Sequence, residues 1–161
     1  MIDPGLKDKV VLVTGGNNPF GIGAAIARAF ASHGARIFVH YFRQEIDLSG
    51  PGKQDHRSQE PGLAFFYEQQ QKTADEVVAS IRKSGGIAES WETDLRYPQN
   101  VQRLFEQAEA AFGQVDILVN NAGISRPVPH DDLDALDDAL IDSIFRVNVR
   151  RLRARKYCLP T

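Results

Sequence analysis

Short apolar runs along the chain alternate with longer segments in which apolar residues recur every three or four positions. The runs fall at 10–13, 36–40, 87–93 and 115–120, and the periodic segments at about 21–33, 73–84, 98–112 and 136–148. A short β-favouring run bounded by glycine or polar residues is typical of a strand, and the longer period is typical of a helix with one buried face. Because the two kinds of segment alternate, the pattern favours parallel strands joined by helical crossovers.

Each helical segment has a predicted buried face, and several have a predicted boundary. Thr73 to Glu76 has the spacing of a capping box, so the second helix is expected to begin there. Gly34, Gly85 and Gly113 follow the first three segments and are expected to end them. In chain order, the predicted buried faces are Ile22, Ala25, Ile26, Ala29 and Phe30; Ala74, Val77, Val78 and Ile81; Val101, Leu104, Phe105 and Ala108; and Leu136, Leu140, Ile141, Ile144 and Phe145.

A glycine-rich turn connects the first strand to the first helix, within the stretch VVLVTGGNNPFGIG at 10–23. Glycines let the backbone approach a bound anion, and the free N–H groups at the helix start face that anion with the positive end of the helix dipole behind them. The natural anion is the pyrophosphate of a dinucleotide. The alternative is that the glycines serve only the geometry of the loop.

Three further motifs follow the later strands and the last helix. They are Thr93-Asp94-Leu95, Asn120-Asn121-Ala122-Gly123 and Val147-Asn148-Val149. Together with the turn from Thr14 to Gly23, and in this order, they make the chain resemble the short-chain dehydrogenase/reductase family from Lys9 to Val149. The resemblance implies a Rossmann-type, doubly wound α/β sheet of about four parallel strands in the order 3-2-1-4, and it makes 1–149 an NAD(P)-binding domain.

The resemblance also implies the residues of a cofactor site. Asp94 would bind the adenine amino group and Leu95 would lend its backbone N–H, while Asp94 as a cap of the next helix is an alternative that is compatible with this role. Small residues after the fourth strand would let a cofactor ring lie against the backbone, at a corner that Asn120 and Asn121 are expected to hold through hydrogen bonds to backbone groups. The turn is longer than the usual pattern, which leaves open which N–H groups contact phosphate. The candidate cofactor residues are Thr14, Gly15, Asn17, Asn18, Phe20, Gly21, Ile22, Arg43, Asp94, Leu95, Asn120, Ala122 and Gly123.

The residues after the second strand bear on which cofactor is preferred. An NAD site usually places an acidic residue there, where it binds the ribose 2′-hydroxyl. Here the sequence reads His40-Tyr41-Phe42-Arg43, and no carboxylate comes before Glu45. Because Arg43 is suited to a 2′-phosphate, NADP(H) is expected to be preferred over NAD(H); the alternative is that Arg43 is a solvated loop residue.

Most of the family's catalytic residues are missing from these 161 residues. The family uses a serine and a Tyr-x-x-x-Lys pair, and none of the four tyrosines here is followed four positions later by lysine. Asn148, which in relatives helps to hold a water of the proton relay, is the one expected catalytic residue. We therefore expect the cofactor part of a carbonyl/alcohol oxidoreductase that is inactive as given. The alternatives are a non-catalytic NADPH-binding module and a fragment that acts only through association.

Two segments depart from the family's pattern. Residues 43–71 form a long insertion, in which 49–62 is expected to be disordered and the apolar stretch Leu63 to Tyr67 is expected to dock, on the cofactor's adenosine end or on a partner subunit. Residues 150–161 form an atypical basic tail. A shifted reading frame or a truncation would explain this tail, as would a basic helix terminus or a polyanion-binding patch. His130 is interpreted as a solvated loop residue.

Composition limits the class of partner. The 19 Lys and Arg residues against 21 Asp and Glu give a formal net charge of -2, which offers no basic field for nucleic acid. The single cysteine fits a reducing compartment, and no run approaches the roughly 18 apolar residues of a membrane span. We expect a cytoplasmic protein that binds a dinucleotide and, in the full-length enzyme, a small-molecule carbonyl or alcohol. The fourth strand, apolar and at the sheet edge, favours a homo-oligomer.

Overall fold

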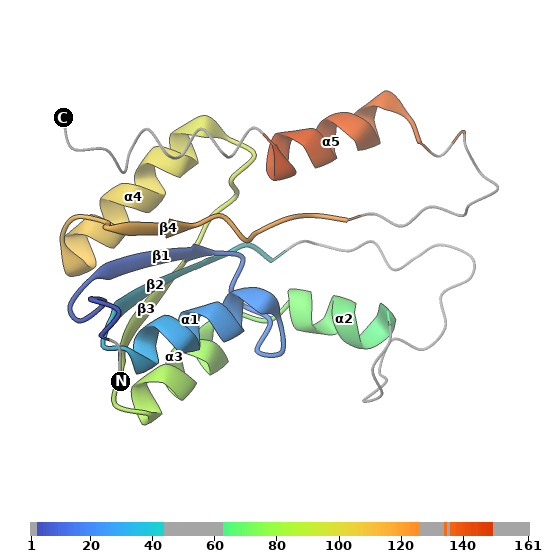
Figure 1. The fold of residues 1–161 in the computed structure, drawn as a ribbon. Helices are drawn as coiled ribbons and strands as arrows, with labels where there is room; N and C mark the ends of the chain where they lie inside the picture. The colour runs from blue at the N-terminus through green and yellow to red at the C-terminus, as the bar shows by residue number, and fades with distance from the viewer. Residues whose placement is uncertain (1–2, 44–62, 126–133, 135, 150–161) are drawn as a thin grey trace.

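The computed structural model describes residues 3–43, 63–125, 134 and 136–149 (Figure 1). The strands in these ranges are β1 (Val10–Thr14), β2 (Arg36–Tyr41), β3 (Ile87–Glu92) and β4 (Ile117–Val119). The helices are α1 (Ile22–Ser32), α2 (Leu63–Gln70), α3 (Asp75–Lys83), α4 (Pro98–Phe112) and α5 (Asp138–Asn148). The predicted strands and helices are all present, and α2 is an additional helix within the insertion.

The four strands form one parallel sheet in the order β3-β2-β1-β4, which confirms the predicted topology. β1 lies inside the sheet, where Val11 pairs with Ile37 of β2 on one side and with Ile117 of β4 on the other. β4 lies at the sheet edge and is shorter than the predicted range of 115–120. Its three residues are half-buried, because only one neighbouring strand covers it within the described part of the chain.

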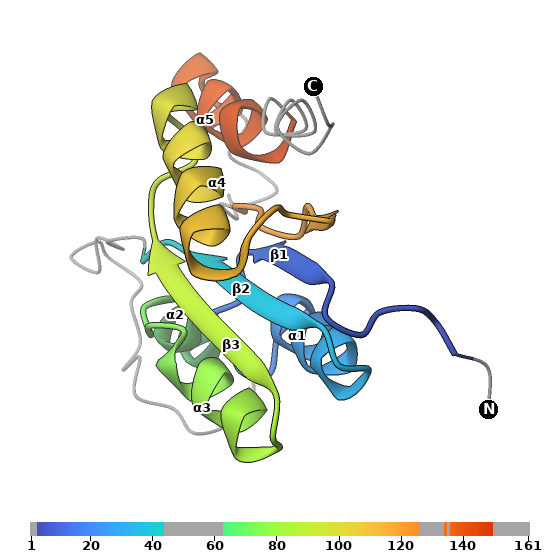
Figure 2. The same cartoon turned by 90° about the vertical axis from the view of Figure 1, so that its left-hand side faces the viewer.

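Helices cover both faces of the sheet, with α1 and α3 on one side and α4 on the other, while α2 lies on the side of α1 and α3 but beyond the carboxyl ends of the strands (Figures 1 and 2). Alternate residues of β1 serve the two faces. Val11 and Val13 belong to the core beneath α1 and α3, and Val10 and Leu12 belong to the core beneath α4. A strand buried on both sides has to be apolar throughout, which explains the continuous run of apolar residues in this part of the sequence.

The predicted faces of α3 and α4 are confirmed, but the capping box at the start of α3 is wrong. Ala74 is the N-cap, and no side chain caps the helix. The Thr73 hydroxyl instead lies 2.7 Å from a carboxylate oxygen of Asp75, and the Glu76 carboxylate lies 3.7 Å from the Lys72 ammonium. Because the helix begins one residue later than the box requires, Thr73 and Glu76 are out of register for the reciprocal bonds.

The predicted face of α1 is confirmed only in part: Ile26 and Phe30 are half-buried and pack against the core, but the other three predicted residues do not. Ile22 is 74% exposed, and Ala25 and Ala29 are exposed as well, while the buried residues are Gly23, Ala24 and Ala27. The helix starts so close to the turn that a Cβ on Gly23 would lie 2.6 Å from the Gly15 carbonyl oxygen. Only the face with the smallest side chains fits against the strands there. The larger apolar side chains therefore lie farther from the sheet.

The predicted face of α5 is confirmed only in part. Leu140 is buried, but Ile141 is 43% exposed and Phe145 is 54% exposed, and Leu136 precedes the helix. The second buried residue, Val147, was not part of the predicted face. α5 extends beyond the carboxyl ends of the strands rather than over the sheet (Figure 1), so few of its side chains meet the rest of the described chain.

Several expectations concern residues outside the described part. They include disorder at 49–62, the role of His130 and the nature of the tail at 150–161. No helix in the described ranges combines the length and apolarity that crossing a membrane requires.

Candidate functional site

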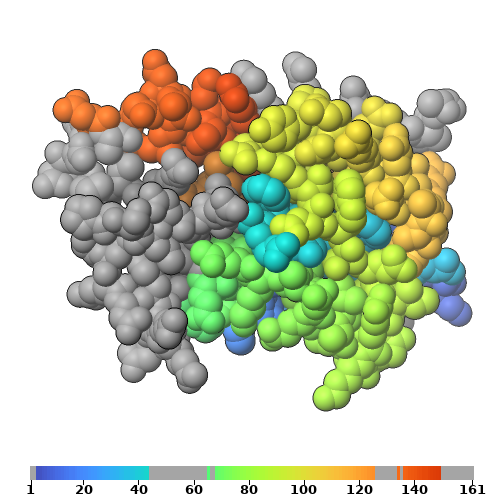
Figure 3. All heavy atoms as spheres, turned by 180° about the vertical axis from the view of Figure 1, so that it is seen from behind, coloured from blue at the N-terminus to red at the C-terminus, as the bar shows by residue number. Residues whose placement is uncertain are grey.

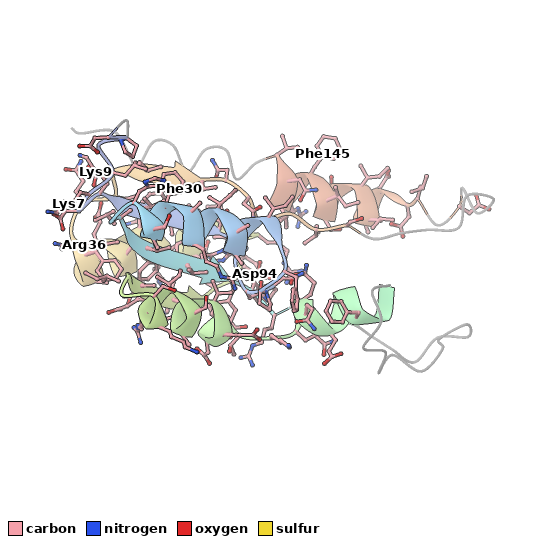
Figure 4. The ribbon with its side chains drawn as sticks, turned by 60° about the horizontal axis from the view of Figure 1, so that its bottom comes forward. Lys7, Lys9, Phe30, Arg36, Asp94 and Phe145 are labelled. Carbon is pink, nitrogen blue, oxygen red and sulfur yellow. The ribbon has the colours of Figure 1, made fainter. Side chains whose placement is uncertain are left out.

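Residues from separate parts of the sequence meet at the carboxyl edge of the sheet. Thr14 ends β1, Asp94 follows β3 and Asn120 follows β4. Figure 4 shows Asp94 toward this edge, with Lys9 and Arg36 at the opposite edge. Parallel strands bring their carboxyl ends together, and ligands of open α/β sheets bind outside those ends.

Thr14 joins the end of β1 to the end of β4. Its side-chain hydroxyl donates to the Val119 carbonyl at 3.2 Å and accepts from the backbone N–H groups of Asn121 and Ala122, each at 3.1 Å. Thr14 is 2% exposed, so water cannot take over these bonds. The hydroxyl therefore fixes the backbone of the corner to which the sequence assigns a cofactor ring.

The two asparagines at this corner behave differently. The Asn121 amide donates to the carbonyls of Thr14 and Gly15, both at 2.9 Å, which confirms the predicted bonds from its side chain to the backbone. Asn120 is exposed, and its side chain bonds to no described residue. The expectation that Asn120 also holds the corner is therefore wrong. The chain turns after β4, so that one of the two consecutive side chains faces the protein and the other faces solvent.

Gly15 permits a close approach between the turn and this corner. Its φ of +71° lies in the left-handed region, and a Cβ there would lie 2.5 Å from Ala122 Cα. Gly16 has a similar constraint, since its Cβ would lie 2.7 Å from a methyl carbon of Val39. A side chain at either position would therefore disturb the packing of the turn, whether or not a ligand is bound.

His40 is a buried residue of the site that the sequence analysis did not recognise. Its Nδ1 lies 3.3 Å from the Gly15 backbone nitrogen, and its Nε2 lies 2.8 Å from the Thr93 carbonyl oxygen. The Gly15 N–H also donates to the His40 carbonyl at 2.8 Å, so both the backbone and the ring of His40 contact the turn. His40 connects the glycine turn to the residue before Asp94. A histidine in an otherwise apolar strand was the signal for it.

The extra residues of the turn hold the insertion. The Asn17 side-chain amide is buried, and it donates to the carbonyls of Gln70 at 3.0 Å and Lys72 at 2.9 Å. The rings of Phe20 and Phe65 lie 5.6 Å apart, so Phe65 of the insertion contacts the turn. The Asn17 side chain is thus directed at α2 and the segment after it.

The start of α1 has the character of an anion site. Gly21 is the N-cap, and no side chain caps the helix, as in α3 and α4, whereas Asp137 caps α5 by accepting from the Leu140 N–H at 2.7 Å. Asn18 shapes the loop before the cap, since its side-chain oxygen accepts from the Phe20 N–H at 2.9 Å. An uncapped helix start beside glycines that tolerate no Cβ fits a pyrophosphate group, which would accept the free N–H bonds.

Asp94 is held by its neighbour two residues later. One carboxylate oxygen accepts from the Arg96 backbone N–H at 2.9 Å, and the other lies 2.6 Å from the Arg96 guanidinium. The cap of α4 is Tyr97, so Asp94 as a cap of that helix is wrong. The Asn100 amide instead binds the Asp94 carbonyl at 2.9 Å. Both carboxylate oxygens already accept from Arg96, so an adenine amino group would have to share them with this residue.

Arg43 forms an ion pair with Glu92 that the sequence did not predict. The guanidinium contacts both carboxylate oxygens, with Nε at 3.0 and 3.1 Å and the terminal nitrogen at 2.7 Å, and the Arg43 backbone N–H donates to the same carboxylate at 3.1 Å. These hydrogen bonds lower the pKa of Glu92 and raise the pKa of Arg43. Arg43 is therefore an exposed loop residue whose guanidinium is paired with a carboxylate.

Asn148 closes the site from α5. Its side-chain oxygen accepts from the Ile124 N–H at 2.9 Å, and its amide nitrogen donates to the Ile124 carbonyl at 3.0 Å. Both polar atoms are thus bonded to the segment after β4. A Cβ on Gly123 would lie 3.4 Å from the Asn148 oxygen, which is ordinary van der Waals contact.

The fold and these motifs define an NAD(P)-type α/β protein, and comparison with known sequences identifies its family. The family profile for short chain dehydrogenases matches residues 56–152. The short-chain dehydrogenase/reductase homolog YusS of Bacillus subtilis is 34% identical over 128 residues, which are 80% of this chain and 92% of YusS. This chain belongs to the short-chain dehydrogenase/reductase family.

Other relatives are much longer than this chain. The peroxisomal hydratase-dehydrogenase-epimerase of Saccharomyces cerevisiae is 38% identical over 123 residues, which are 76% of this chain and 11% of that protein. The crystal structure of a short chain dehydrogenase from Burkholderia cenocepacia in complex with NADP matches with a TM-score of 0.70 and 34% identity. The match covers 95% of this chain and 50% of that one, so the chain spans about half the length of this relative.

Proposed function

We propose that this chain is the dinucleotide-binding part of an NAD(P)(H)-dependent oxidoreductase that acts on a carbonyl/alcohol pair. The observation that carries the proposal is the uncapped start of α1, which lies between glycines that tolerate no Cβ and the corner held by Thr14. When bound, the nicotinamide ring supplies hydride chemistry to the site.

The chain's own residues would bind and orient that cofactor. The N–H groups of the turn and of the start of α1 would bind the pyrophosphate, with Asn17, Asn18, Phe20, Gly21 and Ile22 as the candidates. Asp94 and Leu95 would bind the adenine, and Ala122 and Gly123 would support a ring. Phe20 and Ile22 are 73% and 74% exposed, which leaves two apolar side chains for a ligand to cover.

We further propose that NADP(H) is preferred over NAD(H), with Arg43 binding the 2′-phosphate. The guanidinium fork matches phosphate geometry, and the Burkholderia cenocepacia relative was crystallised with NADP. Asn148 is proposed to keep its family role near the proton relay, where its bonds to Ile124 fix its position. The cytoplasm as location and self-association in solution also remain proposals.

The proposal predicts that the purified chain binds NADPH and does not oxidise it. Binding is expected because the phosphate turn and ring corner are both formed, and turnover is not expected because the chain contains no Tyr-x-x-x-Lys. Titration calorimetry with NADPH measures the first property, and NADPH absorbance with a panel of aldehydes and ketones measures the second.

Each other result selects a different function. Turnover of any carbonyl substrate would contradict the proposed inactivity. Tight NADPH binding by every natural form of the protein, with no form active, would favour a non-catalytic nucleotide-binding module. If no dinucleotide binds or changes the thermal stability, the cofactor role is wrong, and association through the β4 edge becomes the leading function.

A further inference from the structure

We propose that Glu92 is a specificity-determining residue that weakens NADP(H) binding by competing with the cofactor's 2′-phosphate for Arg43. The inference rests on the proposed function, and it adds a residue that the sequence motifs do not assign. Glu92 ends β3 and pairs in register with Tyr41 of β2, so it stands beside the strand end that carries Arg43.

The geometry shows that one edge of the Arg43 guanidinium, formed by Nε and a terminal nitrogen, is engaged by Glu92. Two guanidinium nitrogens bind the two carboxylate oxygens of Glu92 between 2.7 and 3.1 Å, which is the bidentate arrangement that a phosphate would also take. The backbone N–H of Arg43 binds the same carboxylate. A 2′-phosphate therefore has to displace Glu92 from the guanidinium or share it.

Charge near Arg43 also opposes a phosphate. Glu92 and Asp75 both raise the pKa of Arg43 and of Tyr41, which shows that the two carboxylates act on the same small region. The second guanidinium nearby, that of Arg96, lies 5.7 Å from the Phe42 ring centroid and is paired with Asp94. Each of these two cations thus already has a carboxylate partner.

The pair is accessible to a ligand. The side chains of Arg43 and Glu92 are 50% and 28% exposed. Seen from behind the molecule, the end of β2 reaches the surface between α2 and α3 on one side and the segment leading into α4 on the other (Figure 3). Incoming phosphate can therefore reach the guanidinium without opening the core.

The two cofactors respond differently to Glu92. A 2′-phosphate carries a charge of about −1.5 to −2 and only accepts hydrogen bonds near neutral pH, so a carboxylate repels it. The 2′-hydroxyl of NAD(H) can donate a hydrogen bond to a carboxylate, as it does to the acidic residue of NAD sites. Glu92 therefore reduces the preference for NADP(H) that Arg43 provides.

The test measures dissociation constants of NADP⁺ and NAD⁺ by titration calorimetry for the wild type, Glu92→Gln, Arg43→Gln and the double variant. Glu92→Gln keeps the shape and a hydrogen-bond acceptor but removes the charge. We expect it to raise NADP⁺ affinity relative to NAD⁺ by about fivefold, the upper end of the effect of one exposed charge pair. In the Arg43→Gln background, the same substitution should change the ratio much less, because the shared guanidinium is gone.

Asp116→Asn is the matched control. Asp116 pairs with Lys9 at 2.8 Å at the opposite edge of the sheet, so its substitution removes an ion-paired carboxylate without changing the site. Glu92→Ala serves as a second variant if Glu92→Gln does not fold. An unchanged affinity ratio in a Glu92 variant that binds both cofactors would overturn the inference and leave the proposed function intact. If the wild type binds neither NADP⁺ nor NAD⁺, both the inference and the proposed function are wrong.

Discussion

Short polar side chains build this site by binding backbone groups. The Thr14 hydroxyl, the Asn121 amide and the His40 ring together fix the glycine turn, the end of β3 and the corner after β4. Each is bonded within the protein, so each acts by positioning the backbone that a ligand would meet. The stability that these hydrogen bonds contribute depends on burial, because a buried backbone group that loses its partner cannot be solvated.

Thr14→Val tests this positioning at a single residue. The substitution keeps the side-chain shape but removes the buried hydroxyl that accepts from the N–H groups of Asn121 and Ala122 and donates to the Val119 carbonyl. We expect it to lower the free energy of unfolding by about 2 kcal/mol. Denaturant titration followed by circular dichroism measures the change.

Two variants separate the hydroxyl from other effects of changing Thr14. Thr14→Ser keeps the hydroxyl and should restore most of the lost stability. Thr73→Val removes a hydroxyl that bonds to the neighbouring Asp75 near the surface, so its cost should be within about 0.5 kcal/mol. An equal loss of unfolding free energy in Thr14→Val and Thr73→Val would show that the buried hydroxyl stabilises the protein no more than the surface one.

At the scale of elements, the insertion helix α2 contacts the glycine-rich turn between β1 and α1. Asn17 reaches the last residue of α2 and the segment before α3, and Phe20 meets Phe65 (Figure 1). The turn is longer than the usual pattern of its family, and its added length provides these contacts. The loop that would bind phosphate and the helix beside it therefore behave as one unit.

Asn17→Ala should uncouple that unit. The substitution leaves the carbonyls of Gln70 and Lys72 without the shared amide donor. We expect faster hydrogen exchange of backbone amides in 63–72 and a stability loss of about 1–2 kcal/mol. Mass spectrometry of peptides from this range measures the exchange.

Asn100→Ala is the matched control for the helix. Its amide also donates to a backbone carbonyl, that of Asp94 at 2.9 Å, but it belongs to α4 on the other face of the sheet. Exchange in 63–72 should be unchanged in this variant. If Asn17→Ala also leaves this exchange unchanged, Asn17 does not hold α2.

At the scale of the whole molecule, one parallel sheet carries ion pairs at both of its ends. Glu92 pairs with Arg43 at the carboxyl edge, and Asp116 pairs with Lys9 at the amino edge. The hydrogen bonds of these cationic partners hold the pKa values of both carboxyl groups below their usual range. The folded state therefore binds protons less readily at both ends than the unfolded chain does.

This difference predicts destabilisation in acid. A carboxylate whose pKa is lowered on folding contributes stability above its unfolded pKa and loses it as the pH falls through its folded pKa. The free energy of unfolding should thus decline as the pH drops below about 5. Urea titrations at several pH values should show a shallower decline for the double variant Glu92→Gln, Asp116→Asn.

A surface charge variant controls for the loss of negative charge. Asp142→Asn removes a carboxylate that is mostly exposed and lies 3.4 Å from Arg146. Its decline in acid should match that of the wild type. The same decline in the double variant would show that the two ion pairs do not account for the pH dependence.

The sequence by itself determined the element order and the faces of α3 and α4, because periodicity and glycine placement are local properties. The strand order 3-2-1-4 followed from the resemblance of its motifs to the family. The sequence also determined the family and the positions of Thr14, Asp94 and Gly123 at strand ends. Tertiary structure alone decided which face of α1 is buried, since the close approach of Gly23 to Gly15 overrides apolar periodicity. It likewise decided the partners of Asn17, His40 and Arg43, whose bonds to Gln70, Thr93 and Glu92 span about 50 residues of chain. Such pairs form only when parallel strands bring their ends together, and no local pattern records them.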